Sequence, residues 1–180
     1  MGIRDDAKQL TRENILLVTT SLLQEKGYVR LSSREISEAC NVSQGTIFLH
    51  FGTKNNLLNE ILYGNVLKFE DALNERCIPS ETQDTFIRNF LNTLSEYENI
   101  LSRTYKDYFY LSDSLQKQIT DLETIIKNKL FDNLKENRSS GINIIDSFIL
   151  IDSFISQIKY YLMEKNVYSI SNSILKQKRG

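Results

Sequence analysis

The side chains best suited to bind another molecule are concentrated in one short segment, residues 43–50. Ser43 and Thr46 carry hydroxyls that can bond phosphate oxygens, and Gln44 carries an amide that can form two hydrogen bonds with adenine. Gly45 has no side chain, so the backbone N–H groups around it can approach an anion closely. We therefore expect this segment to contact nucleic acid rather than to make or break bonds.

The composition excludes most catalytic chemistry. His50 is the only histidine, which rules out a histidine-rich metal site, and Cys40 and Cys77 are too far apart in sequence to form a CxxC motif. Neither a carboxylate pair nor a nucleophile motif accompanies the single imidazole. We therefore expect no enzyme, no bound metal and no cofactor.

Apolar residues recur at helical spacing along the chain, which predicts an all-α fold. Ser32 and Glu35 form a capping box that starts a short helix ending near Asn41, and Ser43 caps a second short helix over 44–51. Two short helices joined by a three-residue turn have the dimensions of a helix-turn-helix. In that motif the second helix enters the major groove with its first residues nearest the bases.

Polar residues that can cap a helix precede the other predicted helices. Thr11, Thr53 and Ser80 are the expected caps of the first, fourth and fifth helices, the last as a capping box with Gln83. Besides the two short helices, helices are expected over residues 11–26 and 54–77, directly after the cap at residue 80, and over 103–111, 113–138, 142–165 and 168–177.

The segment from Val42 to Phe51 reads Val-Ser-Gln-Gly-Thr-Ile-Phe-Leu-His-Phe and is followed by Lys54 and Leu57. It resembles the signature of the tetracycline-repressor (TetR/AcrR) family, approximately V-S-x-G-T-[LI]-Y-x-[HY]-F-x-x-K-x-x-L. The similarity covers about the first sixty residues. It implies a three-helix helix-turn-helix DNA-binding head over residues 1–53 and a larger ligand-binding and dimerisation bundle over 54–180, with 54–77 as the connecting helix.

The resemblance also implies which side chains contact DNA. It assigns phosphate contacts to Ser33, Ser43, Gly45 and Thr46, base contacts to Gln44 and Leu49, and flanking phosphates to His50 and Lys54. Phe48 would also face the DNA, but it lacks the hydroxyl of the family's usual tyrosine. Leu49 offers only an apolar contact, for example to a thymine methyl group.

The head carries little net charge. Residues 1–55 contain seven basic and six acidic side chains, a net charge of about +1. Because non-specific affinity for DNA comes mostly from cations on phosphates, we expect it to be modest and to depend weakly on salt.

The bundle is rich in aromatic residues, which could line a ligand pocket or fill the core. The predicted pocket residues are Phe69, Phe90, Tyr97, Tyr105, Tyr108, Phe109, Phe131 and Phe154. The pocket interpretation depends mostly on the family resemblance.

Residues 142–165 are apolar on more than one face, so this helix must be covered on both sides. One side can face the core of its own chain and the other a second copy, unless the helix is central in a monomer. The resemblance favours the second copy, through a four-helix dimer interface. The predicted interface residues are Phe148, Ile151, Ile155, Ile158 and Leu162.

Together these features predict a homodimeric transcriptional regulator, most simply a ligand-responsive repressor on a near-palindromic operator. Its expected partners are double-stranded DNA, a small-molecule effector and a second copy, with no membrane. The scarcity of cysteine and the absence of a long apolar run favour the cytoplasm, at the nucleoid. The alternative is a helical sensor or interaction protein of the same architecture that lacks sequence-specific DNA binding, as the near-neutral head suggests.

Overall fold

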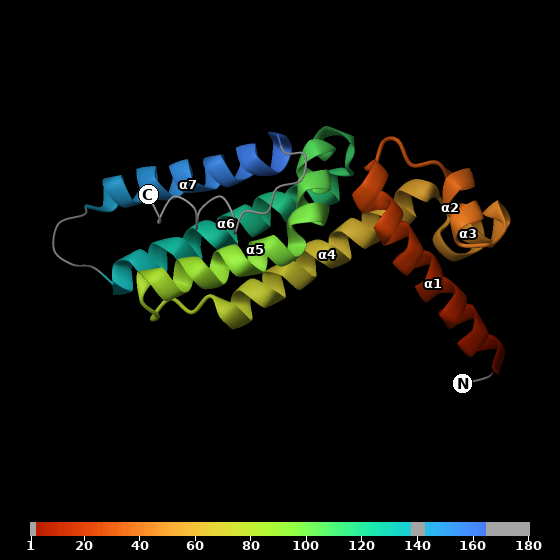
Figure 1. Cartoon of the computed structure of the whole chain (residues 1–180), viewed down its shortest axis with the longest axis horizontal. Coiled ribbons are helices and arrows are strands. Elements are labelled where there is room, and N and C mark those ends of the chain that lie inside the picture. The colour runs from red at the N-terminus through yellow and green to blue at the C-terminus, as the bar shows by residue number, and fades with distance from the viewer. Residues whose placement is uncertain (1–2, 138–142, 165–180) are drawn as a thin grey trace, which may run out of the picture.

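The computed structural model describes residues 3–137 and 143–164, and these residues are almost entirely helical. The elements in chain order are α1 (Ile3–Lys26), α2 (Ser33–Ala39), α3 (Gln44–Phe51), α4 (Lys54–Arg76), α5 (Gln83–Lys106), the short 3-10 helix η1 (Tyr108–Tyr110), α6 (Asp113–Glu136) and α7 (Ile144–Glu164). Helices α1–α3 form the head at one end of an elongated molecule, and α4 runs from the head into the bundle of α4–α7 (Figure 1). The predicted all-α fold with an N-terminal helix-turn-helix is confirmed.

Local caps build the helix-turn-helix as the sequence predicts. The Glu35 N–H donates to Ser32 Oγ at 3.2 Å and the Ser32 N–H donates to Glu35 Oε2 at 2.9 Å, so the capping box is complete. Asn41 makes the turn with a φ of +53°, a left-handed conformation that asparagine tolerates. The buried side chains of Ile47 and Phe51 then hold α3 against the rest of the head.

Two predicted helix boundaries are wrong. Helix α1 begins at Ile3 rather than after Thr11, because the Thr11 hydroxyl donates to the Ala7 carbonyl at 2.9 Å inside a continuous helix. Helix α5 is capped by Thr82, whose hydroxyl accepts the Thr85 N–H at 3.3 Å, and not by Ser80.

The helix predicted separately over 103–111 is also wrong. No glycine or proline interrupts residues 83–106, so α5 continues through Arg103 to Lys106 and only the three residues of η1 follow. The predicted break at 139–141, the helix 168–177 and the outer limits 142 and 165 lie outside the described residues.

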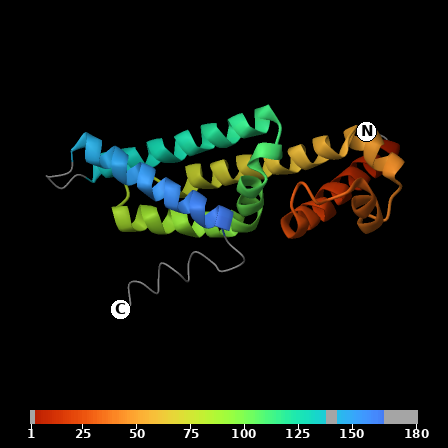
Figure 2. The same ribbon diagram turned by 90° about the horizontal axis from the view of Figure 1, so that it is seen from above.

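In the bundle, α7 lies across α5 and α6 (Figure 2), and all three pack with α4 around an apolar core. Phe69, Phe86 and Leu115 are among the largest fully buried side chains. On the α6 side of α7, Lys159 pairs with Glu123 at 2.9 Å and Asp152 with Lys127 at 2.6 Å. These contacts fix which face of α7 points inward.

The head and the bundle are joined by hydrogen bonds between the ends of α1 and α5. Arg103 donates from Nε to the Gln24 carbonyl at 2.8 Å and from Nη2 to the Glu25 carbonyl at 2.6 Å, which places a cation at the negative end of α1. Asp107 Oδ2 accepts the Tyr28 N–H at 2.7 Å. We refer to these contacts of Arg103 and Asp107 as the α1–α5 clamp.

No helix within the described residues has the length and apolar character needed to span a bilayer.

Candidate nucleic-acid interface

The first turn of α3 is exposed while its inner face is buried. Gln44 and Gly45 are exposed, and Ser43 caps the helix from a β-region backbone conformation. Further along the same outer face, Leu49 is 74% exposed and Phe48 50% exposed. The amide of Gln44 and the two apolar side chains therefore lie on a surface that another molecule can reach.

The hydroxyls of this turn are held by each other. Ser43 Oγ accepts the Thr46 N–H at 3.0 Å, and the two hydroxyl oxygens lie 2.9 Å apart. One hydroxyl proton is used between them, so the pair retains one proton that can be donated outward. Two hydroxyls, the free N–H groups of the first turn and the positive end of the helix dipole together favour an anion at this position.

Ser33 and Lys54 lie at the edges of this surface. Ser33 is half-buried in the first turn of α2. Lys54 Nζ donates to the Leu31 carbonyl at 3.0 Å and lies 5.9 Å from the centroid of the Tyr28 ring. Lys54 thus links the connector before α2 to the start of α4. Its ammonium group has further protons that it can donate to a phosphate.

His50 is turned partly into the protein. Its Nδ1 is buried and has no hydrogen-bond partner within the described residues, and its ring lies 6.1 Å from that of Phe51. Burial, followed by the positive charges of Lys8 and Arg12, lowers the pKa of His50 below its usual value. The imidazole is therefore neutral at neutral pH, and any phosphate contact it makes in that state comes from a neutral N–H.

Sequence reasoning missed Lys8 and Arg12 as neighbours of this surface. Both lie on α1, one helical turn apart, with Lys8 before and Arg12 just after the predicted helix start at Thr11. Arg12 packs over the Phe51 ring at 4.8 Å and bonds Glu60 of α4 at 2.6 Å. Their spacing of four residues would have placed both side chains on one face of a helix. The cap expected at Thr11 left Lys8 outside that helix, so the shared face was not predicted.

Most of the predicted pocket aromatics are core residues. Phe69, Phe90 and Tyr105 are buried around a cavity of only about 20 Å³, roughly the space of one water molecule. Tyr105 donates to Glu123 at 3.0 Å, and burial together with this carboxylate raises the pKa of Tyr105 well above its usual value. These rings therefore fill the core between the helices and do not line a cavity large enough for a ligand.

The remaining predicted aromatics divide between the core edge and the surface. The ring of Tyr97 packs at a tilt against that of Phe69 with centroids 5.4 Å apart, and Tyr108 packs at the edge of the core. Phe131 stacks on Phe148 at 5.0 Å. Phe109 is 84% exposed in η1, so its prediction as a cavity wall is wrong: η1 lies on the outside of the turn between α5 and α6.

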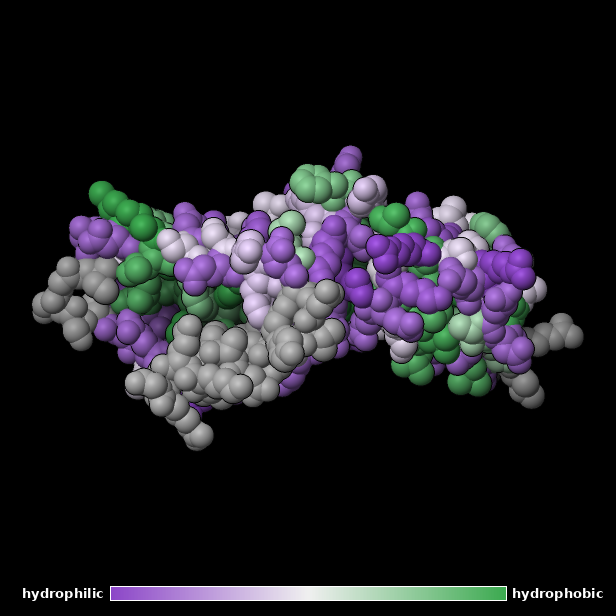
Figure 3. Space-filling view, turned by 45° about the horizontal axis from the view of Figure 1, so that its top comes forward, coloured by the Kyte–Doolittle hydropathy of each residue, from purple (hydrophilic) through white to green (hydrophobic). Residues whose placement is uncertain are grey.

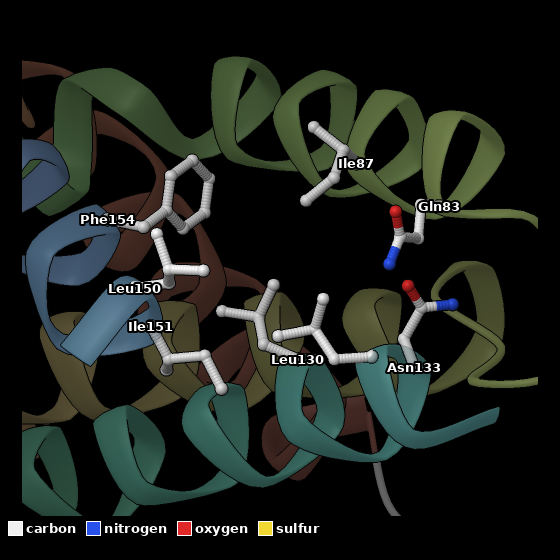
Figure 4. Close-up of a pocket in the computed structure, with 8 residues that line it drawn as sticks. Gln83, Ile87, Leu130, Asn133, Leu150, Ile151 and Phe154 are labelled. Atoms are coloured by element: carbon white, nitrogen blue, oxygen red, sulfur yellow. The ribbon is translucent and has the colours of Figure 1, made fainter. Parts of the chain in front are cut away.

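A second, larger cavity of about 180 Å³ lies between α5, α6 and α7, and we call it the distal cavity (Figure 4). Of the predicted aromatics only Phe154 lines it. Its lining residues are Gln83, Ile87, Leu130, Asn133, Leu134, Leu150, Ile151 and Phe154.

The predicted dimer residues of α7 lie on the face of the helix that packs mostly against its own chain. Ile151, Ile155 and Leu162 are at most 6% exposed and pack into the core of their own chain, so placing them at an interface between copies is wrong. Ile158 is half-buried against the same core, and Phe148 is 54% exposed. The packing of α7 on both α5 and α6 turns that apolar face inward.

Another face of α7 exposes apolar side chains toward both ends of the helix, with the polar residues Asp152, Ser153 and Ser156 between them. We call it the outer face of α7: Ile145, Ile149, Tyr160 and Met163, with Phe148 beside them. Hydrophobic side chains also gather at the end of the bundle farthest from the head (Figure 3). Among the described residues, no group of three histidine, cysteine, aspartate or glutamate side chains could hold a metal ion.

Comparison with known proteins identifies relatives of the head and of the whole fold. Residues 15–61 match the family model described as "Bacterial regulatory proteins, tetR family". QacR, an HTH-type transcriptional regulator of Staphylococcus aureus, is 28% identical over 118 residues, which is 62% of this chain and 62% of QacR. The matched region thus spans less than two thirds of that protein. YvkB, an uncharacterized HTH-type transcriptional regulator of Bacillus subtilis, is 25% identical over 73% of this chain and 70% of its own length.

The fold is shared with solved structures. The structure of AibR in complex with isovaleryl coenzyme A and operator DNA aligns with a TM-score of 0.66 and 16% identity, over 88% of this chain and 91% of that one. At this identity the likeness concerns the fold alone. The helix-turn-helix head of this chain thus matches the tetR family of bacterial regulatory proteins, and the two related regulators support the same similarity.

Proposed function

We propose that this protein is a DNA-binding transcriptional regulator that reads an operator with the first turn of α3. The observation that carries the proposal is the exposed N-terminal turn of α3, where Gln44 stands beside a hydroxyl pair and free N–H groups. Gln44 suits adenine, and Leu49 suits a thymine methyl group. Ser33, Gly45, His50 and Lys54 would contact phosphates around these two base readers, and Phe48 would pack against the backbone.

The regulator acts as a homodimer. The outer face of α7 supports this, because Ile145, Ile149 and Tyr160 expose apolar area on a helix whose opposite face is already packed. Two copies joined there present two recognition helices, and a spacing of about 34–36 Å lets both enter successive major grooves of a near-palindromic operator.

A small molecule bound in the bundle controls the affinity for DNA, and the simplest form of control is repression relieved by the ligand. The distal cavity supports the existence of such a ligand, since a bundle of this size has room for it. AibR is described with both a coenzyme A ester and operator DNA bound, so the shared fold is compatible with both kinds of partner. Such a regulator acts in the cytoplasm, at the nucleoid.

The test is DNA binding by fluorescence anisotropy, with DNA from upstream of the protein's own gene and scrambled DNA of equal length. The wild type should prefer the upstream fragment, and Gln44→Ala should remove about 1–3 kcal/mol of that preference. Asn92→Ala is the matched control, because Asn92 is an exposed amide on α5 in the bundle. A wild type that binds both DNAs equally would contradict the proposal.

A second candidate function is that of a sensor or interaction protein that does not read DNA sequence. It is favoured by the internal pairing of the head's cations: Lys26 bonds Glu35 at 2.7 Å and Arg34 bonds Glu38 at 2.8 Å. The same anisotropy experiment decides between the two, since the second function predicts no preference and no effect of Gln44→Ala.

A further inference from the structure

The distal cavity has a definite position and size. It lies where the first turns of α5, the last turns of α6 and the middle of α7 meet, at the end of the bundle away from the head (Figures 1 and 4). Its volume of about 180 Å³ is slightly larger than the roughly 150 Å³ apolar cavity that is known to take up benzene. A single substituted ring is therefore the size of molecule that it can accept.

The chemistry of the lining favours neutral ligands over charged ones. All eight lining side chains are uncharged, and six of them are aliphatic or aromatic. The site is partly open to solvent, because Gln83 and Leu150 are exposed, but an ion there would lose part of its hydration without gaining a partner of opposite charge, which costs more than placing a neutral ring there. The apolar walls are provided by Ile87 of α5, Leu130 and Leu134 of α6, and three residues of α7.

One end of the distal cavity carries a hydrogen-bond acceptor whose orientation is fixed. Asn133 is 2% exposed, and its Nδ2 donates to the carbonyls of Pro79 and Glu81, each at 2.8 Å. Because both neighbours are carbonyl oxygens, only the NH₂ group can face them, so Oδ1 must point the other way. Figure 4 shows that oxygen turned toward Gln83 at the end of the distal cavity.

Gln83 adds a second amide at the same end. Its side chain is exposed at the start of α5 and makes no hydrogen bond to any other described residue. An amide can both donate and accept, so Gln83 can adapt to a ligand, whereas the fixed Asn133 oxygen requires a donor.

We propose that the distal cavity binds a neutral molecule built on one aromatic ring and carrying one hydrogen-bond donor, as in a phenol. The ring lies among Ile87, Leu130 and Phe154, and its hydroxyl donates to Asn133 Oδ1. The occupant is thus a small metabolite or xenobiotic of the phenol class rather than a segment of protein.

The effect of this ligand on DNA rests on the function proposed above, whereas its binding does not. Ile87 lines the distal cavity near one end of α5, and Arg103 and Asp107 hold the head at the other end through the α1–α5 clamp. A ligand that favours one position of α5 relative to α6 and α7 therefore biases the position of the head. The bias can be no larger than the difference in ligand affinity between the two positions.

The test is isothermal titration calorimetry of the full chain, without DNA, using three probes of similar size. The probes are p-cresol, toluene and benzoate, which carry respectively a donor, no donor and a negative charge. We expect saturable binding of one p-cresol per chain, binding of toluene weaker by about five- to tenfold for the lost hydrogen bond, and no heat with benzoate.

Two variants of α5 show where the probe binds. Ile87→Phe fills part of the distal cavity and should abolish p-cresol binding, whereas Leu91→Phe, one turn further along α5 and outside the lining, should retain it. A thermal melt of each variant establishes that it is folded. Adding p-cresol to the anisotropy experiment then tests the coupling to DNA separately.

Three outcomes would overturn the assignment. The first is that the folded wild type shows no saturable p-cresol binding, as when a second copy fills the cavity. The second is equal binding by Ile87→Phe, and the third is benzoate binding as tight as that of p-cresol. Saturable p-cresol binding that leaves DNA affinity unchanged would uphold the site and refute the ligand control proposed above.

Discussion

Helices α3 and α7 both expose apolar side chains, but different contacts decide which side chains are exposed. In α3 the cap at Ser43 and the buried Ile47 and Phe51 lie within eight residues of Leu49, so the outer face follows from local sequence. In α7 the inner face is selected by contacts with helices far away in the sequence, such as the pair between Lys159 and Glu123 of α6. Short-range caps can be read from a sequence, whereas the orientation of a helix that is apolar all round is decided only by packing.

The largest expected effect separates the two faces of α7. Ile155→Ala removes a side chain that is 6% exposed and should lower the free energy of unfolding by about 2–5 kcal/mol. Ile149→Ala removes one that is 59% exposed and should change the stability of the single chain by less than about 0.5 kcal/mol. Urea denaturation monitored by circular dichroism measures both values.

The same pair of variants tests the homodimer. Ile149→Ala should weaken self-association in sedimentation velocity, since Ile149 belongs to the outer face of α7. If Ile149→Ala left association unchanged and Ile155→Ala cost less than Ile149→Ala, the assignment of inner and outer faces would be wrong.

A second prediction concerns the α1–α5 clamp that joins the two regions. Gly27 has a φ of +83°, and a Cβ there would lie 2.9 Å from Asp107 Oδ2. Gly27→Ala should cost about 1–2 kcal/mol from the left-handed backbone alone, and more because the Tyr28–Asp107 bond is disturbed.

Gly64 provides the matched control for the clamp. It lies within α4, and a Cβ there meets nothing within 4 Å. Gly64→Ala should therefore stabilise the protein by roughly 0.5–1 kcal/mol. A loss of stability at Gly64 as large as that at Gly27 would show that the α1–α5 clamp is not the cause. Urea denaturation again provides the measurement.

The sequence predicted the features that depend on neighbours three or four residues away. The box of Ser32 with Glu35 and the caps at Ser43 and Thr53 are present, and they fix the start of α2, α3 and α4. Capping potential alone gave wrong helix starts at Thr11 and Ser80. The Thr11 hydroxyl bonds a carbonyl inside α1, and Ser80 lies outside α5, which Thr82 caps.

The bundle was harder to predict for a physical reason. Aromatic residues contribute the same apolar area to a core as to a cavity wall, so composition could not tell that Phe69 and Phe90 would be packed. The distal cavity arises instead where aliphatic residues of three helices fail to meet. Asn133 gave no signal in the sequence, since its role depends on the carbonyls of residues 79 and 81.

A third prediction uses the acid sensitivity of the head. Hydrogen bonds from Lys26 and then Ser32 lower the pKa of Glu35 from 4.5 to about 2. The stability linked to this ionisation is present above pH 4.5 and is lost as the pH falls from 4.5 toward 2. Glu35→Gln keeps a side chain that can complete the capping box, but it removes the charge.

Compared with the wild type, Glu35→Gln should therefore be less stable at pH 7 and should lose less stability between pH 4.5 and pH 2. Glu25→Gln, an exposed glutamate on α1, should retain the wild-type profile. Urea denaturation at a series of pH values measures the profiles. Parallel profiles for the wild type and Glu35→Gln would show that Glu35 does not contribute.

The smallest expected effect is on the salt dependence of DNA binding. Lys26 and Arg34 are paired with carboxylates inside the head, which leaves few cations for phosphates. The slope of log K against log salt should therefore be no steeper than about −6 per dimer. Glu38→Gln removes the partner of Arg34, which is 79% exposed, and should steepen the slope by about 0.9 per protomer.

Asp121→Asn is the control. It breaks the similarly spaced pair with Lys117 in the bundle and should leave the slope unchanged, because that pair is far from the head. Anisotropy titrations at a series of salt concentrations measure the three slopes. A wild-type slope well beyond −6 would mean that DNA draws these cations out of their internal pairs, and the near-neutral head would then be a property of the free protein only.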